Sequence, residues 1–319
     1  MIDFARRIAA DAARLLLERL GHLRAGEIDF KGRRDLVTAA DRAAEALLAE
    51  AIEREFPGDA ILGEERVRKA GHSGRLWIVD PLDGTTNFVH VHPMFCVSVA
   101  LAEGYRAIER VPPGGPRNAS VARDEERAHP RLEPNASGFF APGDLPRPLI
   151  AVIHAPQLRE EFWAERGKGA WMRDTGAGGA RRMRVSETKE LADALLATGF
   201  AYRMNEVAND NCENFTRLAR RARGIRRGGS AALDLAYTAA GRFDGFWELY
   251  LKPWDAAAGI LLVEEAGGRV SDVRGRPRAL EGTEVLASNG GLHEAISALL
   301  DEADPAWALE ERRKLRAGE

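Results

Sequence analysis

The sequence predicts a mixed α and β fold in which helical and extended segments alternate and some extended segments follow one another directly. Apolar residues recur at helical spacing in residues 3–20, and a short apolar run at residues 76–79 is typical of a buried strand. Residues 95–101 alternate as a strand does. Strand segments without a helix between them favour a mixed sheet over a strictly parallel one.

Two helices open the chain. The helix expected over residues 3–20 places its apolar side chains on one face, and Gly21 stands where a helix-ending glycine is common. A second amphipathic helix is expected over residues 41–56, because Pro57 follows it and does not continue a helix.

The middle of the chain contains strands and one long irregular segment. Strands are expected at residues 76–79 and 95–101, with a turn at residues 81–84 between them. Residues 104–146 are rich in Pro, Gly, Arg and Glu without a sustained period, which predicts a long surface loop or a disordered insert. A linker between domains is less favoured, because strand-like sequence resumes at residues 149–153.

The C-terminal part is more regular, and the charged tail after Pro305 predicts no element of its own. Gly228 and Gly229 form a turn that opens one of its helices. Helices are expected over residues 207–222, 231–240, 256–266 and 292–302, and strands at residues 225, 243–251 and 285–287.

The composition is that of an ordinary globular protein. Hydrophobic residues make up 45% and charged residues 30% of the 319-residue chain, and the formal net charge is −3. This balance predicts neither a nucleic acid nor an anionic membrane as a partner. The two cysteines, Cys96 and Cys212, are far apart, which favours a reducing environment over a disulfide framework. Charges interrupt the first twenty residues, so we expect a cytoplasmic protein without a signal peptide or membrane span.

The strongest chemical signal is the segment of residues 80–88, directly after the strand expected at residues 76–79. Asp80 and Asp83 flank a turn, so both carboxylates and the Leu82 carbonyl between them are expected at one sheet edge. Hard cations such as Mg²⁺ take oxygen ligands in near-octahedral geometry, and this set supplies three. The alternative explanation is a turn whose aspartate caps the next helix.

Gly84 allows the backbone to approach a ligand closely, and residues 85–87 read as the start of a helix. The free N–H groups at such a start favour a phosphate group.

Four segments, in order, resemble the inositol monophosphatase family. Residues 77–88 match its signature almost letter for letter. Residues 63–65 and 254–259 match two further elements, and residues 35–41, with Lys31 before them, match a fourth. The chain is similar to this family over nearly its whole length, apart from residues 104–146 and the tail.

The resemblance implies an α+β fold of the sugar-phosphatase type, a layered αβαβα sandwich. Residues 1–185 would form an N-terminal half that carries the metal-binding turn. Residues 186–319 would form a C-terminal half that completes the active site. The family joins Glu103 to the strand at Leu149 by a short hairpin turn, so residues 104–146 are a departure from its pattern. If this insert is disordered, proteases should cut it while activity is retained.

By the same resemblance, the site holds two or three Mg²⁺ ions. The implied metal ligands are Glu64, Asp80, the Leu82 carbonyl, Asp83 and Asp255. The implied catalytic residues are Glu64, Asp83 and Thr85, and Thr85 would position the attacking water together with Glu64. Two divalent ions can clamp the attacking and leaving oxygens of an in-line displacement.

The resemblance also implies a substrate pocket. The N–H groups of Gly84 and Thr85 would hold phosphate oxygens, and the alcohol would lie against Gly229, Ser230, Ala231 and Glu248. Lys31 and Asp41 would lie near the active site.

Several of these residues have simpler explanations. Asp255 would serve as a helix cap, Thr38 and Asp41 fit a capping box, and Glu64 fits a solvated acidic pair with Glu65. Lys31 reads equally as a surface lysine and Glu248 as an exposed strand residue. His90 and His92 read as loop histidines.

The implied reaction is Mg²⁺-dependent hydrolysis of a phosphate monoester, foremost inositol 1-phosphate, by a metal-activated water. Fructose bisphosphate, histidinol phosphate and adenosine bisphosphates are the substrates of relatives and stay open as alternatives. Nucleotide- and histidinol-type relatives tend to carry Lys after the Gly-Thr step, whereas Thr86 stands here. This difference favours the inositol type.

The rival from another class is a regulatory homologue without catalysis, against which the presence of every expected acidic ligand argues. Family resemblance further implies a lithium-sensitive homodimer. Its partner would be a small phosphate monoester, with no nucleic acid and no membrane.

Overall fold

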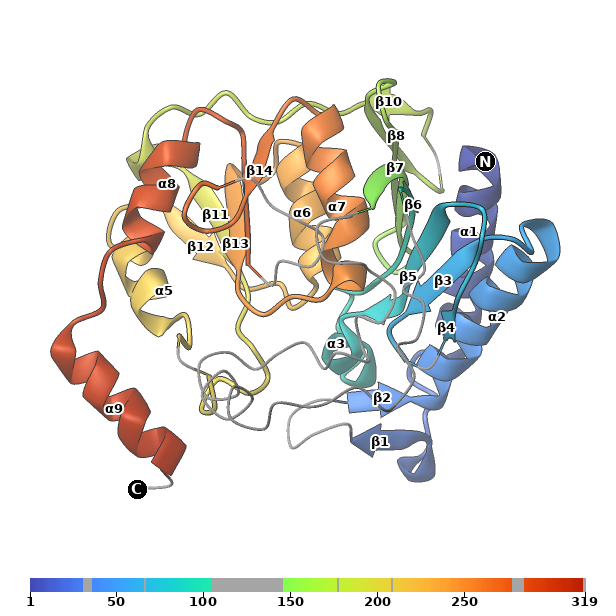
Figure 1. The fold of residues 1–319 in the computed structure, drawn as a ribbon, viewed down its shortest axis with the longest axis horizontal. Helices are drawn as coiled ribbons and strands as arrows, with labels where there is room; N and C mark the ends of the chain where they lie inside the picture. Colours follow the sequence, from blue (N-terminus) through green and yellow to red (C-terminus); the bar gives the residue numbers. More distant parts are fainter. Residues whose placement is uncertain are drawn as a thin grey trace, which may run out of the picture.

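The protein is a layered αβαβα sandwich, as the sequence predicts (Figure 1). The computed structural model describes residues 1–30, 36–65, 67–104, 146–176, 178–207, 209–276 and 284–317. Within these ranges no helix has both the length and the apolar character needed to cross a membrane.

The larger sheet has eight strands in the order β10-β9-β8-β7-β6-β5-β3-β4, and its pairs are antiparallel except for β3 with β5. Its strands alternate between two cores, so Leu76 and Ile78 face one core while Trp77 and Val79 face the other. The strands are β3 (Ala60–Gly63), β4 (Arg68–Lys69), β5 (Arg75–Asp83), β6 (Cys96–Glu103), β7 (Arg147–Ala155), β8 (Glu160–Glu165), β9 (Ala170–Asp174) and β10 (Arg181–Arg182).

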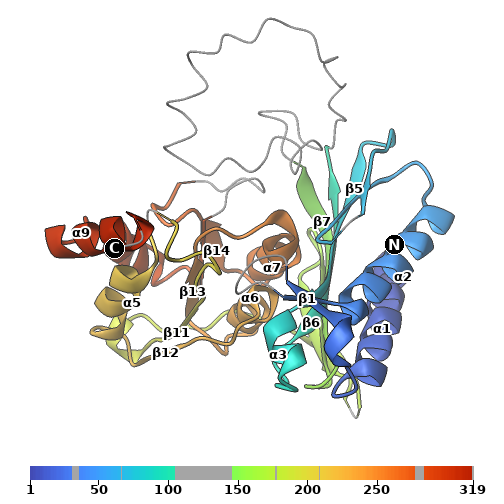
Figure 2. The same ribbon diagram turned by 90° about the horizontal axis from the view of Figure 1, so that it is seen from below.

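Helices α1 (Ile2–Arg19) and α2 (Ala39–Glu55) cover the outer face of this sheet. Figure 2 shows the sheet edge-on between this pair and α6 and α7. The turn after α1 uses Gly21 at a φ of 74°, a conformation that glycine adopts without strain, so the predicted helix end is confirmed.

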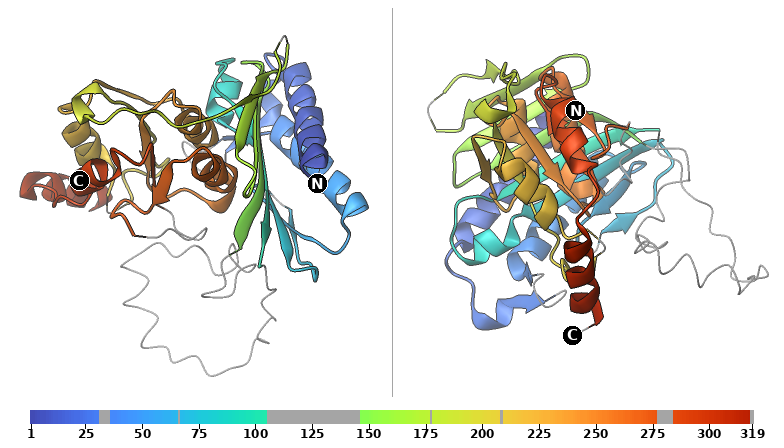
Figure 3. Two further views of the ribbon diagram at one scale, coloured as in Figure 1. Left: turned by 90° about the horizontal axis from the view of Figure 1, so that it is seen from above. Right: turned by 90° about the vertical axis from the view of Figure 1, so that its left-hand side faces the viewer.

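The smaller sheet has five strands in the order β12-β11-β13-β15-β14. Helices α6 (Ala231–Ala239) and α7 (Pro253–Glu265) fill the space between the two sheets, and α5 (Cys212–Ala219) and α8 (His293–Leu300) cover its far face (Figure 3, left). The strands are β11 (Leu195–Thr198), β12 (Gly224–Arg226), β13 (Gly245–Glu248), β14 (Arg269–Ser271) and β15 (Val285–Ser288).

The remaining elements lie at the margins of the sandwich. Helix α9 extends away from the body toward the C-terminus (Figure 3, right). These elements are η1 (Ala25–Glu27), the ladder of β1 (Ile28–Phe30) with β2 (Leu36–Thr38), α3 (Thr85–Val89), η2 (Leu191–Asp193) and α9 (Ala306–Ala317).

Three predicted boundaries are wrong. The helix expected over residues 207–222 is only α5, which begins at Cys212. Asn211 before it has a φ of 71°, a left-handed conformation that does not continue a right-handed helix. The turn expected at residues 81–84 is instead the end of β5, where the register against β6 shifts. Helix α7 begins at Pro253 rather than residue 256, since proline is favoured in the first helical turn.

Two further segments differ from expectation. The strand expected over residues 243–251 is only β13, and the tail after Pro305, for which no element was predicted, carries α9.

The prediction of disorder for residues 104–146 falls almost entirely outside the described residues. The flanking strands do meet, because Glu103 of β6 pairs with Arg147 of β7. The chain therefore leaves and returns at neighbouring antiparallel strands, where a short turn would suffice.

Candidate active site

The central feature is the end of β5, where the register against β6 shifts between Asp80, which pairs with Ser98, and Asp83, which pairs with Cys96. The backbone N–H of Leu82 donates to Oδ1 of Asp80 at 3.0 Å and fixes that carboxyl. Gly84 follows with a φ of 95°, and a Cβ there would lie 2.8 Å from the Met94 carbonyl oxygen. Glycine is therefore required both for the left-handed backbone and for the close approach.

Helix α2 supplies a hydrogen-bonded chain to this turn. The capping box expected at its start is present, with the Thr38 N–H donating to Oδ2 of Asp41 at 2.9 Å. The Thr85 hydroxyl lies 3.0 Å from Oδ1 of Asp41 and 3.1 Å from the Leu82 carbonyl oxygen. Asp41 thus caps α2 and also orients Thr85, while Lys31 lies outside the described residues.

Glu45, one helical turn after Asp41, fixes the loop that carries Glu64. Its carboxylate accepts the N–H groups of Glu65 at 2.8 Å and Val67 at 3.1 Å, and its side chain is 2% exposed. The sequence argument missed this residue. Its spacing of four from Asp41 is the signal that would have found it, because such residues share a helix face.

Asp83 links the turn to the C-terminal half. Its Oδ2 accepts the Ser230 hydroxyl at 2.7 Å and the Ala232 N–H at 2.7 Å. A carboxylate at a helix start is favoured by the unsatisfied N–H groups there. The end of β5 and the first turn of α6 are therefore joined through the Asp83 carboxylate.

Four carboxyl groups from three segments act on one another electrostatically. Burial raises the pKa of Asp80 well above its usual range, and the charges of Glu64, Asp83 and Asp255 raise it further. Burial also raises the pKa of Asp83, to about 6, against the lowering effect of its hydrogen bonds from Ser230 and Ala232.

Asp255 behaves in the same way. Burial raises its pKa well above the usual range, and the nearby charges of Asp83 and Glu64 add to the effect. Asp255 does not precede the helix as the helix-cap interpretation expected, because Lys252 is the N-cap of α7; Asp255 lies in the first turn, where its carboxylate accepts the Lys252 N–H at 2.6 Å. The raised pKa values of Asp80, Asp83 and Asp255 mark a site where a divalent cation would stabilise the charged carboxylates.

The donor set suits a Mg²⁺ ion that is bound partly by water and substrate better than an ion that is held by protein side chains alone. Across the described ranges, no three His, Cys, Asp or Glu side chains are arranged as a preformed cage for one ion. Mg²⁺ commonly keeps several waters and binds one or two carboxylates together with substrate phosphate oxygens. Asp80, Asp83 and Asp255, whose charges act on one another, are carboxylates of the kind that such a site needs.

The predicted alcohol pocket lies beside this cluster. Gly229 has a φ of 84°, Ser230 is the N-cap of α6, and Ala231 begins that helix. Glu248 ends β13, where burial and the charges of Asp234 and Asp83 raise its pKa to about 8. The exposed-strand interpretation of Glu248 is therefore wrong, since its side chain is only partly exposed and packs against Gly199.

Asn87 of α3 makes hydrogen bonds to the loop before β6 and to the turn before α6. Its Nδ2 donates to the carbonyl oxygens of Met94 at 2.6 Å and Gly228 at 2.9 Å. The latter bond joins α3 to the turn before α6 and so connects the segment after Asp83 with the residues predicted to line the alcohol pocket.

Two more residues near the pocket escaped the sequence argument. Asp234, in the first turn of α6, is 1% exposed, and its Oδ1 has no hydrogen-bond partner among the described residues. Arg227 precedes the Gly228–Gly229 turn. Neither belongs to a motif, so only the fold brings them to the site.

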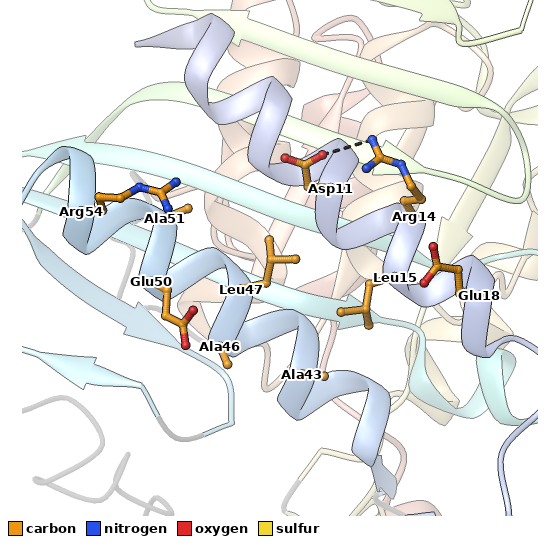
Figure 4. A pocket seen from close by; sticks show the side chains of 10 residues that line it. All are labelled: Asp11, Arg14, Leu15, Glu18, Ala43, Ala46, Leu47, Glu50, Ala51 and Arg54. Carbon is orange, nitrogen blue, oxygen red and sulfur yellow. Dashed lines mark ion pairs between the residues drawn. The ribbon is translucent and has the colours of Figure 1, made fainter.

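A separate groove lies between α1 and α2 on the outer side of the molecule (Figure 4). An ion pair between Arg14 and Asp11, at 3.1 Å, stands on its rim, and Leu15 and Leu47 lie within it. None of the predicted site residues lines this groove.

The comparisons with known proteins cover the whole sandwich. The model of the Inositol monophosphatase family matches residues 1–108 and 145–304. The Nus factor SuhB of Pseudomonas aeruginosa is 40% identical over 93% of this chain and 94% of its own. The inositol-1-monophosphatase of Synechocystis is 38% identical over 88% of this chain and 82% of its own.

Solved structures agree. The extragenic suppressor protein SuhB of Bartonella henselae superposes with a TM-score of 0.75 at 33% identity, covering 95% of this chain and 98% of that one. The inositol monophosphatase of Anabaena gives a TM-score of 0.73 at 35% identity, covering 96% and 97%. The family model skips residues 109–144, within the segment predicted from sequence to depart from the family. The layered fold, the motifs in their order and these likenesses together establish that the chain belongs to the inositol monophosphatase family.

Proposed function

We propose that this protein hydrolyses phosphate monoesters in a Mg²⁺-dependent reaction, with inositol 1-phosphate as its reference substrate. The observation that carries the proposal is the group formed by Glu64, Asp80, Asp83 and Asp255. Its members come from three segments of the chain, and burial together with the neighbouring charges raises the pKa values of Asp80, Asp83 and Asp255. Such a cluster is costly without a cation and suited to phosphate chemistry with one.

In this proposal Glu64, Asp80, Asp83, Asp255 and the Leu82 carbonyl hold the ions. Bound Mg²⁺ would supply Lewis acidity toward the phosphate and the leaving oxygen. The protein contributes mainly position and charge, because phosphoryl transfer needs little covalent chemistry from side chains.

The Thr85 hydroxyl orients the attacking water, and Asp41 accepts the hydrogen bond that fixes the hydroxyl. The contacts of 3.0 Å to Asp41 and 3.1 Å to the Leu82 carbonyl hold Thr85 in place. The N–H groups of Gly84 and Thr85 face the phosphate at the start of α3. Gly229, Ser230, Ala231 and Glu248 receive the alcohol, whose hydroxyl groups Glu248 can bind as an acceptor or, when protonated, as a donor.

The test is phosphate release from four substrates, measured with Mg²⁺ and with a chelator. The substrates are inositol 1-phosphate, fructose 1,6-bisphosphate, histidinol phosphate and adenosine 3′,5′-bisphosphate. We expect Mg²⁺-dependent release that is fastest with inositol 1-phosphate. Faster release from another substrate would keep the mechanism and change the substrate. No release from any of them, by a folded protein, would contradict the proposal.

Finer properties follow from the family. We propose a cytoplasmic homodimer whose activity lithium inhibits. Analytical ultracentrifugation and lithium titration of the Mg²⁺-dependent activity test the last two properties.

A second candidate function rests on the relative named Nus factor SuhB, which is 40% identical over 93% of this chain. A Nus factor role could accompany hydrolysis or stand without it, so the expected absence of a nucleic-acid partner stays a prediction. Complementation of a strain lacking its SuhB, with active protein and with an Asp83→Asn variant, separates the two roles. Rescue by both proteins would favour the Nus factor role.

A further inference from the structure

Arg227 lies at the turn that opens the alcohol pocket. It follows β12 and directly precedes Gly228, Gly229 and Ser230. A Cβ built on Gly229 would lie 2.8 Å from Nη1 of Arg227 and 3.0 Å from Nδ2 of Asn87. The guanidinium therefore rests on the same glycine that forms part of the pocket wall, and its side chain is exposed.

This guanidinium makes no hydrogen bond and no ion pair within the described part of the chain. Other arginines nearby are engaged. Nη1 of Arg226 lies 3.2 Å from the Ile225 carbonyl oxygen. Arg68 donates to the carbonyl oxygens of Val67 at 2.8 Å and Glu64 at 3.1 Å. Arg227 thus keeps its donors available beside the site.

Two acidic residues, Asp234 and Glu248, lie within electrostatic range of Arg227. The charge of Arg227 lowers the pKa values of Asp234 and Glu248, which burial raises. Asp234 lies on the buried side of the turn, where a Cβ on Gly228 would come within 2.8 Å of its Oδ1. Arg227 is exposed, so its guanidinium is accessible beside these two acids.

A substrate whose alcohol bears only hydroxyl groups has no negative charge on that part of the molecule to pair with the Arg227 guanidinium. An arginine offers a planar fork of donors that matches phosphate oxygens in pairs. A phosphate is hydrolysed at the carboxylate cluster, and a second one on the same molecule would reach past the alcohol pocket to its rim.

We propose that Arg227 binds a second phosphate group of the substrate, so that the enzyme prefers a sugar bisphosphate to the same sugar with one phosphate. This inference rests on the proposed phosphomonoesterase function. It concerns how much the second phosphate of a sugar raises kcat/KM. It makes no claim about whether inositol 1-phosphate is hydrolysed faster than other substrates.

The test compares fructose 1-phosphate with fructose 1,6-bisphosphate in the wild type, Arg227→Gln and Arg226→Gln. The wild type should have the higher kcat/KM for the bisphosphate. A charge-assisted bond of ordinary strength corresponds to about ten-fold in kcat/KM, so Arg227→Gln should lose about ten-fold on the bisphosphate, mainly through KM. Its kcat/KM for fructose 1-phosphate should stay close to the wild type.

The matched control is Arg226→Gln, which removes the same charge one residue away and should change neither substrate. Added salt should weaken the bisphosphate preference of the wild type and not of Arg227→Gln. Melting temperatures of all three proteins check that the fold is kept.

The outcomes separate the two claims. Equal losses on both substrates in Arg227→Gln would mean that the arginine only balances Asp234 and Glu248, and would overturn the inference. A wild type without preference for the bisphosphate would overturn it too, while Mg²⁺-dependent release from fructose 1-phosphate would still support the proposed function. Release from neither sugar nor inositol 1-phosphate would overturn both.

Discussion

At the scale of single residues, the acids of the site have two roles at once. Asp83 is a proposed metal ligand, and it also accepts the Ser230 hydroxyl and the Ala232 N–H at 2.7 Å each. Its negative charge and its hydrogen-bonding capacity can therefore be separated by substitution.

Asp83→Asn should lower kcat by about 100-fold or more, corresponding to roughly 3 kcal/mol of lost stabilisation of the transition state. The melting temperature should not fall, because the amide oxygen still accepts both hydrogen bonds and the repulsion from Glu64 is relieved. Phosphate release and thermal unfolding measure the two effects. Asp193→Asn, at an exposed position, is the control. Near-normal turnover in folded Asp83→Asn would refute the metal role.

Glu45 shows how a buried acid can act without touching the substrate. Glu45→Gln exchanges one acceptor oxygen for a donor that faces the N–H of Glu65 or Val67. We expect a loss of about 1–3 kcal/mol in the free energy of unfolding, because one buried N–H loses its partner. Displacement of the loop should also raise the Mg²⁺ concentration needed for half-maximal activity.

Chemical denaturation and Mg²⁺ titration check this prediction. The exposed Glu50 on the same helix supplies the matched control, and Glu50→Gln should change neither measurement. If Glu45→Gln lost stability but kept the Mg²⁺ dependence of the wild type, the positioning role of Glu45 would be excluded.

At the scale of elements, helix starts converge on the site. Asp41 accepts the N–H of Thr38 at the start of α2. Asp83 and Ser230 satisfy the first turn of α6, and Asp255 accepts the N–H of Lys252 at the start of α7. Because the N-terminal ends of helices favour negative charge, this arrangement partly offsets the repulsion within the acidic cluster.

Ser230→Ala should therefore affect both stability and metal binding. The hydroxyl donates to Asp83 and accepts the Leu233 N–H at 3.3 Å, so its loss should cost about 1 kcal/mol of folding free energy. Asp83 would also lose a donor, which should weaken Mg²⁺ binding. Ser297→Ala removes a buried hydroxyl that donates to the Val273 carbonyl and should affect stability alone. Identical Mg²⁺ titrations for both variants would argue against the link between α6 and the metal site.

At the scale of the whole molecule, the buried acids make stability depend on pH. Glu248 has a pKa of about 8 in the folded protein against an ordinary 4.5. A raised folded pKa contributes stability that is present below the unfolded pKa and is lost as pH rises through the folded value. The raised pKa values of Asp80 and Asp255 act in the same direction.

His293 acts with the opposite sign, but in a lower window. Its pKa is lowered to about 4 from an ordinary 6.5, mainly by burial, so it weakens the fold only as pH falls below about 6.5. Between about pH 7 and pH 8.5 the carboxyl groups therefore dominate, and the metal-free protein should melt at a lower temperature as pH rises.

Thermal unfolding in a chelator across this range tests the prediction. Glu248→Gln should reduce the slope, and added Mg²⁺ should raise the melting temperature most at the high end, where the carboxylates are charged. A melting temperature that rises with pH in the chelator would contradict the raised pKa values of these carboxyl groups in the folded protein.

The segment that the family model skips offers a second test at this scale. Glu103 and Arg147 already pair across β6 and β7, so an Asn-Gly turn in place of residues 105–145 would connect them directly. We expect activity within about two-fold of the wild type, because the family model matches the chain on both sides of this segment without residues 109–144. If the shortened protein were folded but inactive, residues 105–145 would be needed for the reaction.

The sequence by itself determined the mixed α and β class and the location of Asp80 and Asp83 at the end of a buried strand, and its resemblance to the family implied the layered sandwich. The apolar run at residues 76–79 is a local signal of a buried strand, whereas the continuation of β5 to Asp83 depends on its pairing with β6 and was not predicted. Helices α1, α2, α6 and α8 were predicted close to their observed bounds, since a period of 3.6 residues is a local signal. Strands β8 and β9 were not predicted, because short strands become evident mainly through their partners.

Only the tertiary structure decided which residues share the site. Asp83 and Ser230 are 147 positions apart, and no local pattern reports that one caps the helix of the other. Glu45, Asp234 and Arg227 belong to no motif, yet folding places the first behind the Glu64 loop and the other two around the Gly228 turn. The physical reason is that burial, electrostatic coupling and unsatisfied donors are properties of packed neighbours, which the order of residues along a chain does not contain.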